Sequence, residues 1–105
     1  MLSKWQIRYD QEFINDVRYW KTQVSNLREE LQAITEYILE YGEVPEEYNP
    51  HLLVDPSLPY NGNMDFHLFD GKLDLLVIYT EIEKKKIFRF IRLGSHKQLF
   101  HPYDE

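Results

Sequence analysis

Apolar residues recur along the chain at spacings that predict its elements. Alternation of apolar and polar residues over residues 5–9 indicates a short half-buried strand. Spacings of three and four residues then predict two amphipathic helices joined as an antiparallel hairpin. The apolar positions of these helices are Phe13, Val17, Trp20, Val24, Leu27, Leu31, Ile34, Ile38 and Tyr41. We expect Asp10 and Ser25 to be N-caps and Gly42 to end the second helix.

The second half of the chain reads as strands. Residues 43–63 are rich in proline and predict an irregular loop, which is long for a small domain. Three strand patterns follow, at residues 64–69, 73–79 and 87–92. Asp70-Gly71 is a hairpin signal between the first two of these. The order predicts an α+β fold, with an N-terminal strand and the helix hairpin packed on one face of a small antiparallel sheet.

Composition narrows the class of protein. A chain of 105 residues with 43% hydrophobic residues predicts one globular domain over residues 1–105. The absence of cysteine excludes disulfides and thiolate metal sites. With no membrane-length apolar run and no signal-peptide pattern, we expect a cytoplasmic protein that does not bind membranes.

The net charge of −6 argues against non-specific nucleic-acid binding, but one segment is basic. Residues 84–97 contain no acidic residue, and we call their basic side chains the cationic strip. Its members are Lys84, Lys85, Lys86, Arg89, Arg92 and Lys97. The strip could face a polyanion, or its lysines could simply solvate a turn at a sheet edge.

The end of the last predicted strand carries the most suggestive chemistry. We expect a turn at Gly94, a residue that tolerates positive φ at no steric cost, which would set Arg92, His96 and Phe100 close together. These groups suit an RNA phosphate, a proton transfer and a stacked base, respectively. Taken alone, the motif fits equally an ordinary turn, a core aromatic residue and a surface histidine.

Three histidines and two aspartates allow several kinds of site. His51, His67 and His96, with Asp65 and Asp74, could bind zinc, but they lack a diagnostic ligand spacing. A hydrolase triad is disfavoured because no Gly-x-Ser-x-Gly elbow is present. The remaining hypothesis is acid–base cleavage of RNA, which needs a base, an acid and a cation. Histidine and arginine supply these parts.

Three segments together resemble a known family. Residues 62–67 carry Gly-x-x-Asp-x-His, residues 74–79 carry Asp followed by an apolar run, and residues 92–100 carry Arg-x-Gly-x-His-x-x-Leu-Phe. With the order of elements, these segments resemble the YafQ-type toxins of the RelE superfamily, the toxin half of type II toxin–antitoxin pairs. The resemblance covers nearly the whole chain.

The resemblance implies a ribosome-dependent mRNA endoribonuclease that needs no metal or other cofactor. It implies a cognate antitoxin, which we expect to be of the ribbon-helix-helix type, with the ribosome and mRNA as further partners. His96 carries over as the main acid–base residue, with His67 and His51 in support. Asp74 would orient a histidine, Arg92 would stabilise phosphate charge and Phe100 would stack on a base. The expected substrate contacts are Lys84, Lys86, Arg89, Lys97 and Asp65.

The chain also departs from the family pattern. Toxins of this kind are usually basic, whereas this chain is acidic. The segment after His51 is longer than in the family, and Asp70-Gly71 reads as an insertion. Two alternatives therefore remain: a gyrase poison on the same scaffold without nuclease chemistry, and a weakened toxin that acts mainly by binding its antitoxin.

Overall fold

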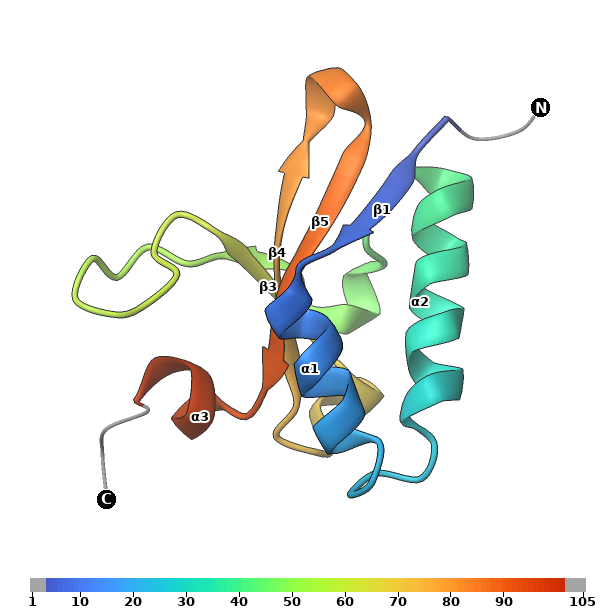
Figure 1. Ribbon diagram of the computed structural model, residues 1–105. Helices are drawn as coiled ribbons and strands as arrows, with labels where there is room; N and C mark the ends of the chain where they lie inside the picture. The colour runs from blue at the N-terminus through green and yellow to red at the C-terminus, as the bar shows by residue number, and fades with distance from the viewer. Residues whose placement is uncertain (1–3, 102–105) are drawn as a thin grey trace.

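Five strands and three α-helices form the part of the chain that the computed structural model describes, residues 4–101 (Figure 1). The helices are α1 (Gln11–Trp20), α2 (Leu27–Tyr41) and α3 (His96–Phe100). The strands are β1 (Gln6–Tyr9), β2 (His51–Leu52), β3 (Met64–His67), β4 (Leu76–Ile82) and β5 (Ile87–Gly94). Short 3₁₀ turns lie at Glu46–Tyr48, Phe69–Gly71 and Glu83–Lys85. The expected α+β class is confirmed.

The strands form one sheet in the order β1-β5-β4-β3-β2. Strands β3 to β5 pair antiparallel with their neighbours, as expected, and β2, which was expected to be part of an irregular loop, pairs antiparallel with β3. Strand β1, however, runs parallel to β5, with Gln6 beside Ile87 and Tyr9 beside Phe90. The sheet is therefore mixed, and the expectation of a purely antiparallel sheet is wrong at this edge. No turn signal connects two strands this far apart in sequence, so nothing local indicated their relative direction.

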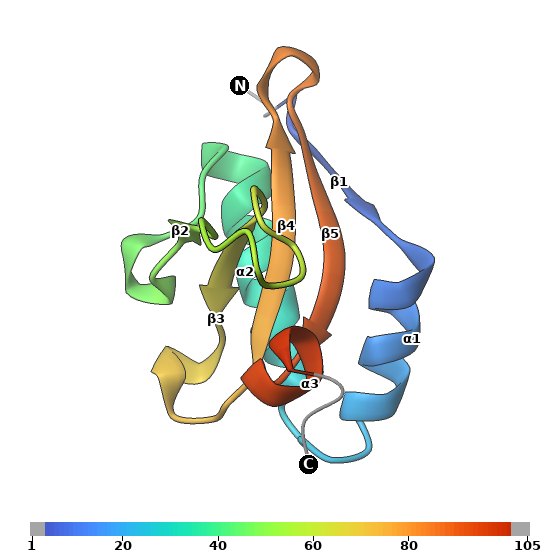
Figure 2. The same ribbon diagram turned by 90° about the vertical axis from the view of Figure 1, so that its left-hand side faces the viewer.

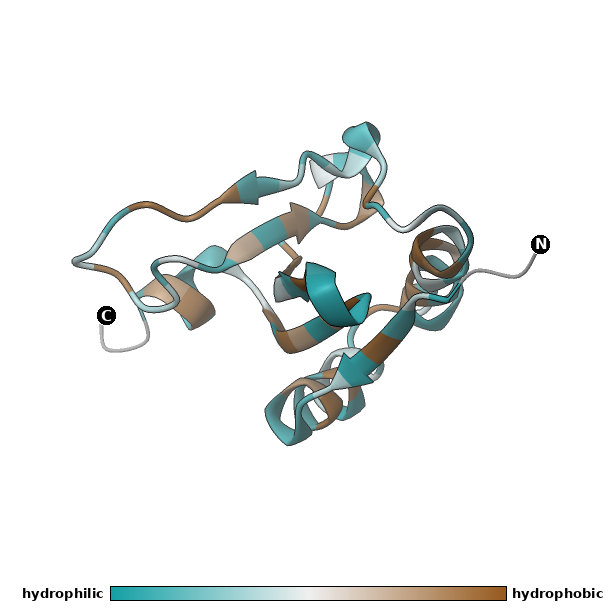
Figure 3. Ribbon diagram, turned by 90° about the horizontal axis from the view of Figure 1, so that it is seen from above, coloured by the Kyte–Doolittle hydropathy of each residue, from teal (hydrophilic) through white to brown (hydrophobic). Residues whose placement is uncertain are grey.

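The helix hairpin packs on one face of the sheet, and its two helices run antiparallel (Figure 1). Phe13, Ile34 and Ile38 are almost fully buried in a core that includes Phe66 and Phe90 from the sheet. Seen from above, α2 lies end-on beside the strands, with apolar residues on part of its circumference (Figure 3). Burial of each such side chain contributes about 1.5–3 kcal/mol, so the predicted stripe is the main support of the helices.

Helix α2 begins later than its sequence suggested. Its N-cap is Asn26, not Ser25, and its first residue is Leu27. The backbone N–H of Leu27 donates to the carbonyl of Val24 at 3.3 Å, so the chain is still turning at Ser25. The hydroxyl of Ser25 donates to the side chain of Asn26 instead of accepting from the helix.

The other two predicted helix ends are at the expected residues. Asp10 is the N-cap of α1, although its carboxylate makes no capping hydrogen bond and binds Arg89 instead. Gly42 ends α2 with a φ of +71°. A Cβ at Gly42 would lie 2.2 Å from the indole nitrogen of Trp5, so close packing as well as backbone conformation requires glycine here.

Strand β4 is apolar throughout its first half because both of its faces are covered. Val77 and Tyr79 face the helix core. The opposite face carries a second cluster, in which α3 and the segment 53–60 lie over the sheet (Figure 2). The second cluster consists of Leu76, Ile78, Leu99 and Phe100, with Leu53, Leu58, Tyr60 and Ile91 packed against it.

The connection from β3 to β4 is longer than the expected two-residue hairpin. Asp70 and Gly71 lie in a 3₁₀ turn that begins at Phe69, and all three residues have positive φ. The side chain of Glu30 accepts a 2.6 Å hydrogen bond from the backbone N–H of Phe69, which ties this turn to α2. Strand β4 consequently begins at Leu76, and residue 74 lies in the connection, where its side chain can reach α3.

Candidate active site

Three of the predicted site residues meet on one face of the sheet because of strand register. His51 of β2 pairs directly with Asp65 of β3, so their side chains share a face. His67 lies two residues further along β3 and therefore points the same way. The sequence placed His51 in a loop; the short strand β2 is what brings it to Asp65.

Asp65 lies at the centre of this group and is 1% exposed. Its Oδ1 is 2.9 Å from His51 Nδ1 and 3.9 Å from His67 Nε2. His51 Nδ1 is also 3.0 Å from the carbonyl oxygen of Asn49, so two acceptors compete for one ring N–H. Within residues 4–101, Oδ1 has no donor in hydrogen-bond geometry, and the 2.9 Å approach is an ion pair only when His51 is protonated.

The charge of Asp65 is opposed by its surroundings. Burial raises the pKa of its carboxyl group, and this effect outweighs the nearby His51, His67 and His96, which lower it. A buried carboxylate with an unsatisfied oxygen is costly to maintain. Such groups concentrate at functional sites more than in structural cores.

His96 is held by a different carboxylate. Ser95 is the N-cap of α3 and accepts a hydrogen bond from the backbone N–H of Gln98 at 3.1 Å, which places His96 in the first turn. Asp74 lies 2.5 Å from His96 Nδ1 and accepts from its backbone N–H at 3.2 Å. With Nδ1–H donating to Asp74, the lone pair is on Nε2, the nitrogen then available for proton transfer.

The carboxyl group of Asp74 responds to this contact. Burial acts to raise its pKa, but the hydrogen bonds from His96 outweigh burial and lower the pKa. Asp74 therefore remains ionised to lower pH than an ordinary aspartate and continues to accept the hydrogen bond from the imidazole of His96.

Gly94 serves the site differently from what was expected. It ends β5, where the chain turns into α3, but it is absent from the residues with positive φ in the described chain, so the tolerance of glycine for positive φ is not used here. A Cβ at this position would lie 2.3 Å from Oε1 of Gln98 and 3.2 Å from Leu99. The glycine is needed for close approach of α3 to the strand end.

Four rings form a row from β2 to α3. His51 and His67 are stacked with centroids 5.9 Å apart, His67 and His96 are 5.5 Å apart, and His96 and Phe100 are 5.8 Å apart. We call this set the histidine row. Phe100 is only 8% exposed and belongs to the second cluster, so most of its surface packs inward.

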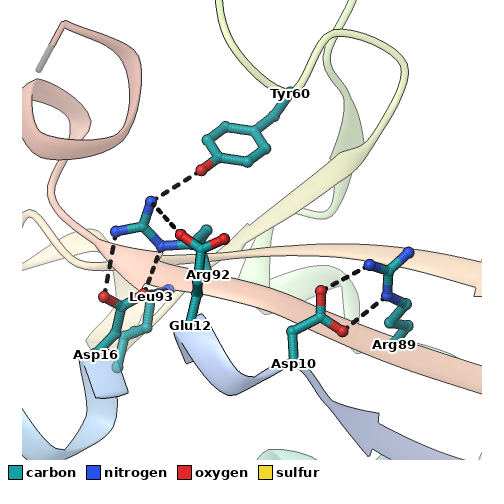
Figure 4. A network of polar contacts seen from close by, with 7 residues as sticks. All are labelled: Asp10, Glu12, Asp16, Tyr60, Arg89, Arg92 and Leu93. Atoms are coloured by element: carbon teal, nitrogen blue, oxygen red, sulfur yellow. Dashed lines mark hydrogen bonds and ion pairs between the residues drawn. The ribbon is translucent and has the colours of Figure 1, made fainter. Parts of the chain in front are cut away.

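Arg92 lies on the same face as the histidine row but is already paired. Asp65 pairs with Ile78, and Ile78 pairs with Arg92, which places the arginine two strands from Asp65. Its guanidinium donates to both carboxylate oxygens of Asp16, at 2.8 and 3.2 Å, and to the hydroxyl of Tyr60 at 2.9 Å (Figure 4). Hydrogen bonding to Asp16 raises the pKa of Arg92 against the opposing effect of burial.

Asp16 also covers part of the edge of β5. Strand β1 pairs with β5 only as far as Phe90, and beyond it the backbone N–H of Leu93 donates to Asp16 at 2.9 Å. Asp16 thus binds the side chain of Arg92 and the backbone of the next residue together (Figure 4). Helix α1 in this way replaces β1 as the neighbour of the strand end.

The cationic strip does not form one surface. Lys84 lies in the turn at the tip of the β4–β5 hairpin and Lys86 follows it, at the opposite end of β5 from His96 (Figure 1). Eight residues of strand, at about 3.3 Å each, separate the two ends by about 25 Å. Arg89, between them, donates to both carboxylate oxygens of Asp10. Of the strip, only Lys97 is next to His96 in the chain.

Comparison with known proteins identifies the family. The family model described as the bacterial toxin of type II toxin–antitoxin system, YafQ, matches residues 5–101. The chain belongs to the YafQ family of type II toxins. No curated protein matches the chain.

Several solved structures share the fold. One is the E. coli DinJ–YafQ complex, with 26% identity, 89% of this chain and 94% of that chain covered, and a TM-score of 0.65. E. coli YafQ has 26% identity, the same coverage and a TM-score of 0.67. A structure described as a metal-bound toxin from Helicobacter pylori has 21% identity, covers 95% of this chain and 100% of that chain, and has a TM-score of 0.65.

The resemblance inferred from the sequence is thus confirmed for family and fold. The roles of individual residues in this YafQ-family chain remain predictions. Two residues that shape the site were missed altogether, Asp16 and Tyr60, since neither belongs to a motif or an apolar pattern. In the described part of the chain no helix is long and apolar enough to cross a membrane.

Proposed function

We propose that this YafQ-family toxin is an endoribonuclease that cleaves mRNA on the ribosome without a metal. The observation that carries the proposal is the histidine row, in which neighbouring imidazoles have centroids less than 6 Å apart and the third imidazole is oriented by Asp74. Several imidazoles on one face can divide the roles of base and acid. The sugar–phosphate backbone of RNA offers a reaction that needs both.

In the proposed reaction the 2′-oxygen attacks the neighbouring phosphorus while the bond from phosphorus to the 5′-oxygen breaks. One imidazole accepts the proton of the 2′-hydroxyl, and a protonated imidazole donates a proton to the departing 5′-oxygen. The products are a 2′,3′-cyclic phosphate and a 5′-hydroxyl. His96 is the main acid–base residue, and His67 and His51 complete the set, because their rings lie next along the row.

In this proposal Lys97 is the main residue that stabilises the negative charge of the phosphorane. Arg92 was the first candidate, but its guanidinium is held by Asp16, which neutralises it, and by Tyr60. In this role Arg92 keeps the strand end and the segment containing Tyr60 in place. Lys97 is exposed and adjacent to His96, so it can approach a bound phosphate.

An antitoxin is the expected partner, as in the E. coli DinJ–YafQ complex. We expect it to be a ribbon-helix-helix protein that covers the histidine row, because shielding these imidazoles stops proton transfer. The ribosome supplies the message in the decoding site. Since the chain carries net charge −6, ribosome binding must depend on local basic side chains such as those at the hairpin tip.

The test is single-turnover cleavage of ribosome-bound message by His96→Gln, with His101→Gln as the matched control. Loss of proton transfer should slow cleavage roughly 10²–10⁴-fold, while ribosome and antitoxin binding change little. His101 follows α3 outside the histidine row, and its variant should cleave at the parent rate. Cleavage by His96→Gln at the parent rate would exclude His96 as the acid–base residue. Toxicity without cleavage would favour a gyrase poison.

A further inference from the structure

The buried carboxylate of Asp65 has a vacant oxygen directed between two imidazoles. Its Oδ1 is close to His51 Nδ1 and His67 Nε2 but accepts no hydrogen bond within residues 4–101. One ligand atom from each of the three residues lies within 4.8 Å of the other two. An acid–base row needs imidazoles, but it does not require a buried carboxylate with a vacant oxygen between them.

We propose that His51, Asp65 and His67 form a binding site for a zinc-like divalent transition metal, and that the bound metal holds the toxin inactive. Neutral imidazole and carboxylate are ordinary zinc ligands, and three protein ligands leave a fourth position for water. Metal binding at this site stands on the geometry alone. The inactivation rests on the proposed nuclease function.

The measured separations fit a tetrahedral ion. Zinc–ligand bonds of about 2.0–2.1 Å place neighbouring ligand atoms roughly 3.3 Å apart. The 2.9 Å from Asp65 Oδ1 to His51 Nδ1 and the 3.9 Å to His67 Nε2 lie on either side of this value. Small rotations of the two imidazoles would equalise them, and these side chains are 46% and 22% exposed.

The ligand set also selects the ion. Two nitrogens and one oxygen suit zinc, nickel or copper, whereas magnesium and calcium prefer oxygen ligands throughout. The buried carboxylate supplies a full negative charge that no cation in hydrogen-bond geometry balances within the described chain. A dication between the rings would balance it and satisfy Oδ1 at once.

Inactivation follows from which atoms the metal would use. The ring lone pairs of His51 and His67 would bind the ion, so neither nitrogen could take up a proton. His96 lies outside the metal-ligand group, with its Nδ1 against Asp74, and would be left without its partners in proton transfer. Cleavage that proceeds in metal-free protein would therefore stop when the metal binds.

The first experiment measures binding alone, on tag-free, EDTA-treated full-length toxin without ribosomes. Zinc is titrated against a chromophoric chelator. We expect one zinc ion per chain, a loss of affinity of at least tenfold in Asp65→Asn and in His51→Gln, and no binding of magnesium. Asp55→Asn, which alters an exposed carboxylate bonded to Ser57, is the matched control and should bind as the parent does.

Thermal melting of each metal-free variant shows whether it is folded. His51→Gln changes a half-exposed residue of a two-residue strand and keeps the test decisive if Asp65→Asn fails to fold. Equal zinc affinity in the parent and in folded His51→Gln and Asp65→Asn would overturn the site.

The second experiment compares ribosome-dependent cleavage by the parent with and without one equivalent of zinc. We expect at least a tenfold lower rate with zinc and recovery with EDTA. Zinc that binds at this site without lowering the rate would overturn the inactivation. If the parent does not cleave under any condition, the nuclease proposal fails, and the binding experiment still decides the metal site.

Discussion

Asp16 and Asp65 are both largely buried carboxylates beside basic side chains, but they differ in their hydrogen-bond partners. Both oxygens of Asp16 accept hydrogen bonds, from the guanidinium of Arg92 and from the backbone of Leu93. Asp65 Oδ1 accepts none within residues 4–101. The first carboxylate is used to hold the sheet edge, whereas the second is left unsatisfied beside two imidazoles.

Structural and functional charges in this molecule differ in whether their hydrogen-bond partners are complete. A charged group whose partners are complete contributes to stability and has little left for a ligand. A charged group that is buried without partners costs stability and is available to a proton, a metal or a substrate. Substitution of the two aspartates should therefore shift stability in opposite directions.

The largest effect is expected from Asp16→Ala. It leaves the guanidinium of Arg92 with only the exposed carboxylate of Glu12, at 3.7 Å, and Leu93 without its acceptor, which should lower the free energy of unfolding by about 2–4 kcal/mol. Urea denaturation followed by circular dichroism measures it. Adding Arg92→Met to Asp16→Ala should recover part of the loss, because the unpaired charge is then removed as well. A loss below about 1 kcal/mol would show that the pair is not structural.

Asp65→Asn should change the free energy of unfolding in the opposite direction. The amide removes a buried charge with an unsatisfied oxygen, so the free energy of unfolding should rise by about 1–3 kcal/mol near neutral pH. Denaturation under the conditions used for Asp16→Ala provides the comparison. A destabilised Asp65→Asn would mean that the carboxylate is better solvated or paired than its contacts indicate.

The pH dependence of the Asp65 effect follows from its pKa. Burial raises the pKa of Asp65 in the folded protein against the opposing effect of His51, His67 and His96. The folded state therefore binds more protons than the unfolded state between the unfolded and folded pKa values, and stability falls as pH rises through that window. The gain in the free energy of unfolding from Asp65→Asn, relative to the parent, should be small near pH 4 and grow towards pH 7. An advantage that is constant with pH would contradict the raised pKa.

Asp74→Asn tests a third carboxylate, one that is exposed and serves a single imidazole. It should leave stability almost unchanged but lower the single-turnover cleavage rate roughly tenfold, about 1.4 kcal/mol of barrier, because the ring of His96 loses its fixed tautomer. The carboxylate of Asp55, also exposed and hydrogen-bonded, gives the control Asp55→Asn. An unchanged cleavage rate would show that the contact between Asp74 and His96 only positions α3 and does not assist proton transfer.

The smallest effect is expected from Asp10→Ala. Asp10 binds Arg89 as Asp16 binds Arg92, with two hydrogen bonds, but on a more exposed part of β5. An exposed pair of this kind contributes less than about 1 kcal/mol. A loss of stability as large as that of Asp16→Ala would show that burial is not what distinguishes the two pairs.

Sequence patterns predicted much of this fold because the patterns are local. Alternation over residues 64–67 placed Asp65 and His67 on one face, and the helical stripe identified Phe13, Ile34 and Ile38 as core. The motif ending at Phe100 brought His96 into the candidate site. Each of these inferences needs only the geometry of one element.

What the sequence could not supply are pairings between distant elements. His51 reaches Asp65 through a strand of two residues inside a proline-rich loop, which has no strand pattern. Asp16 meets Arg92 across 76 positions, and nothing in the neighbourhood of either residue specifies the other. The cationic strip looked continuous in sequence but extends along a strand, so its two ends are far apart.

The parallel pairing of β1 with β5 also has a consequence for the order of assembly. Gln6 finds its partner, Ile87, only after almost the whole chain has been synthesised, and His96 follows later still. Contacts of such long sequence separation carry a large loop-closure cost and slow the search for the native state. A nascent chain therefore has neither a closed sheet edge nor the third imidazole of the histidine row until its last strand and helix have been made.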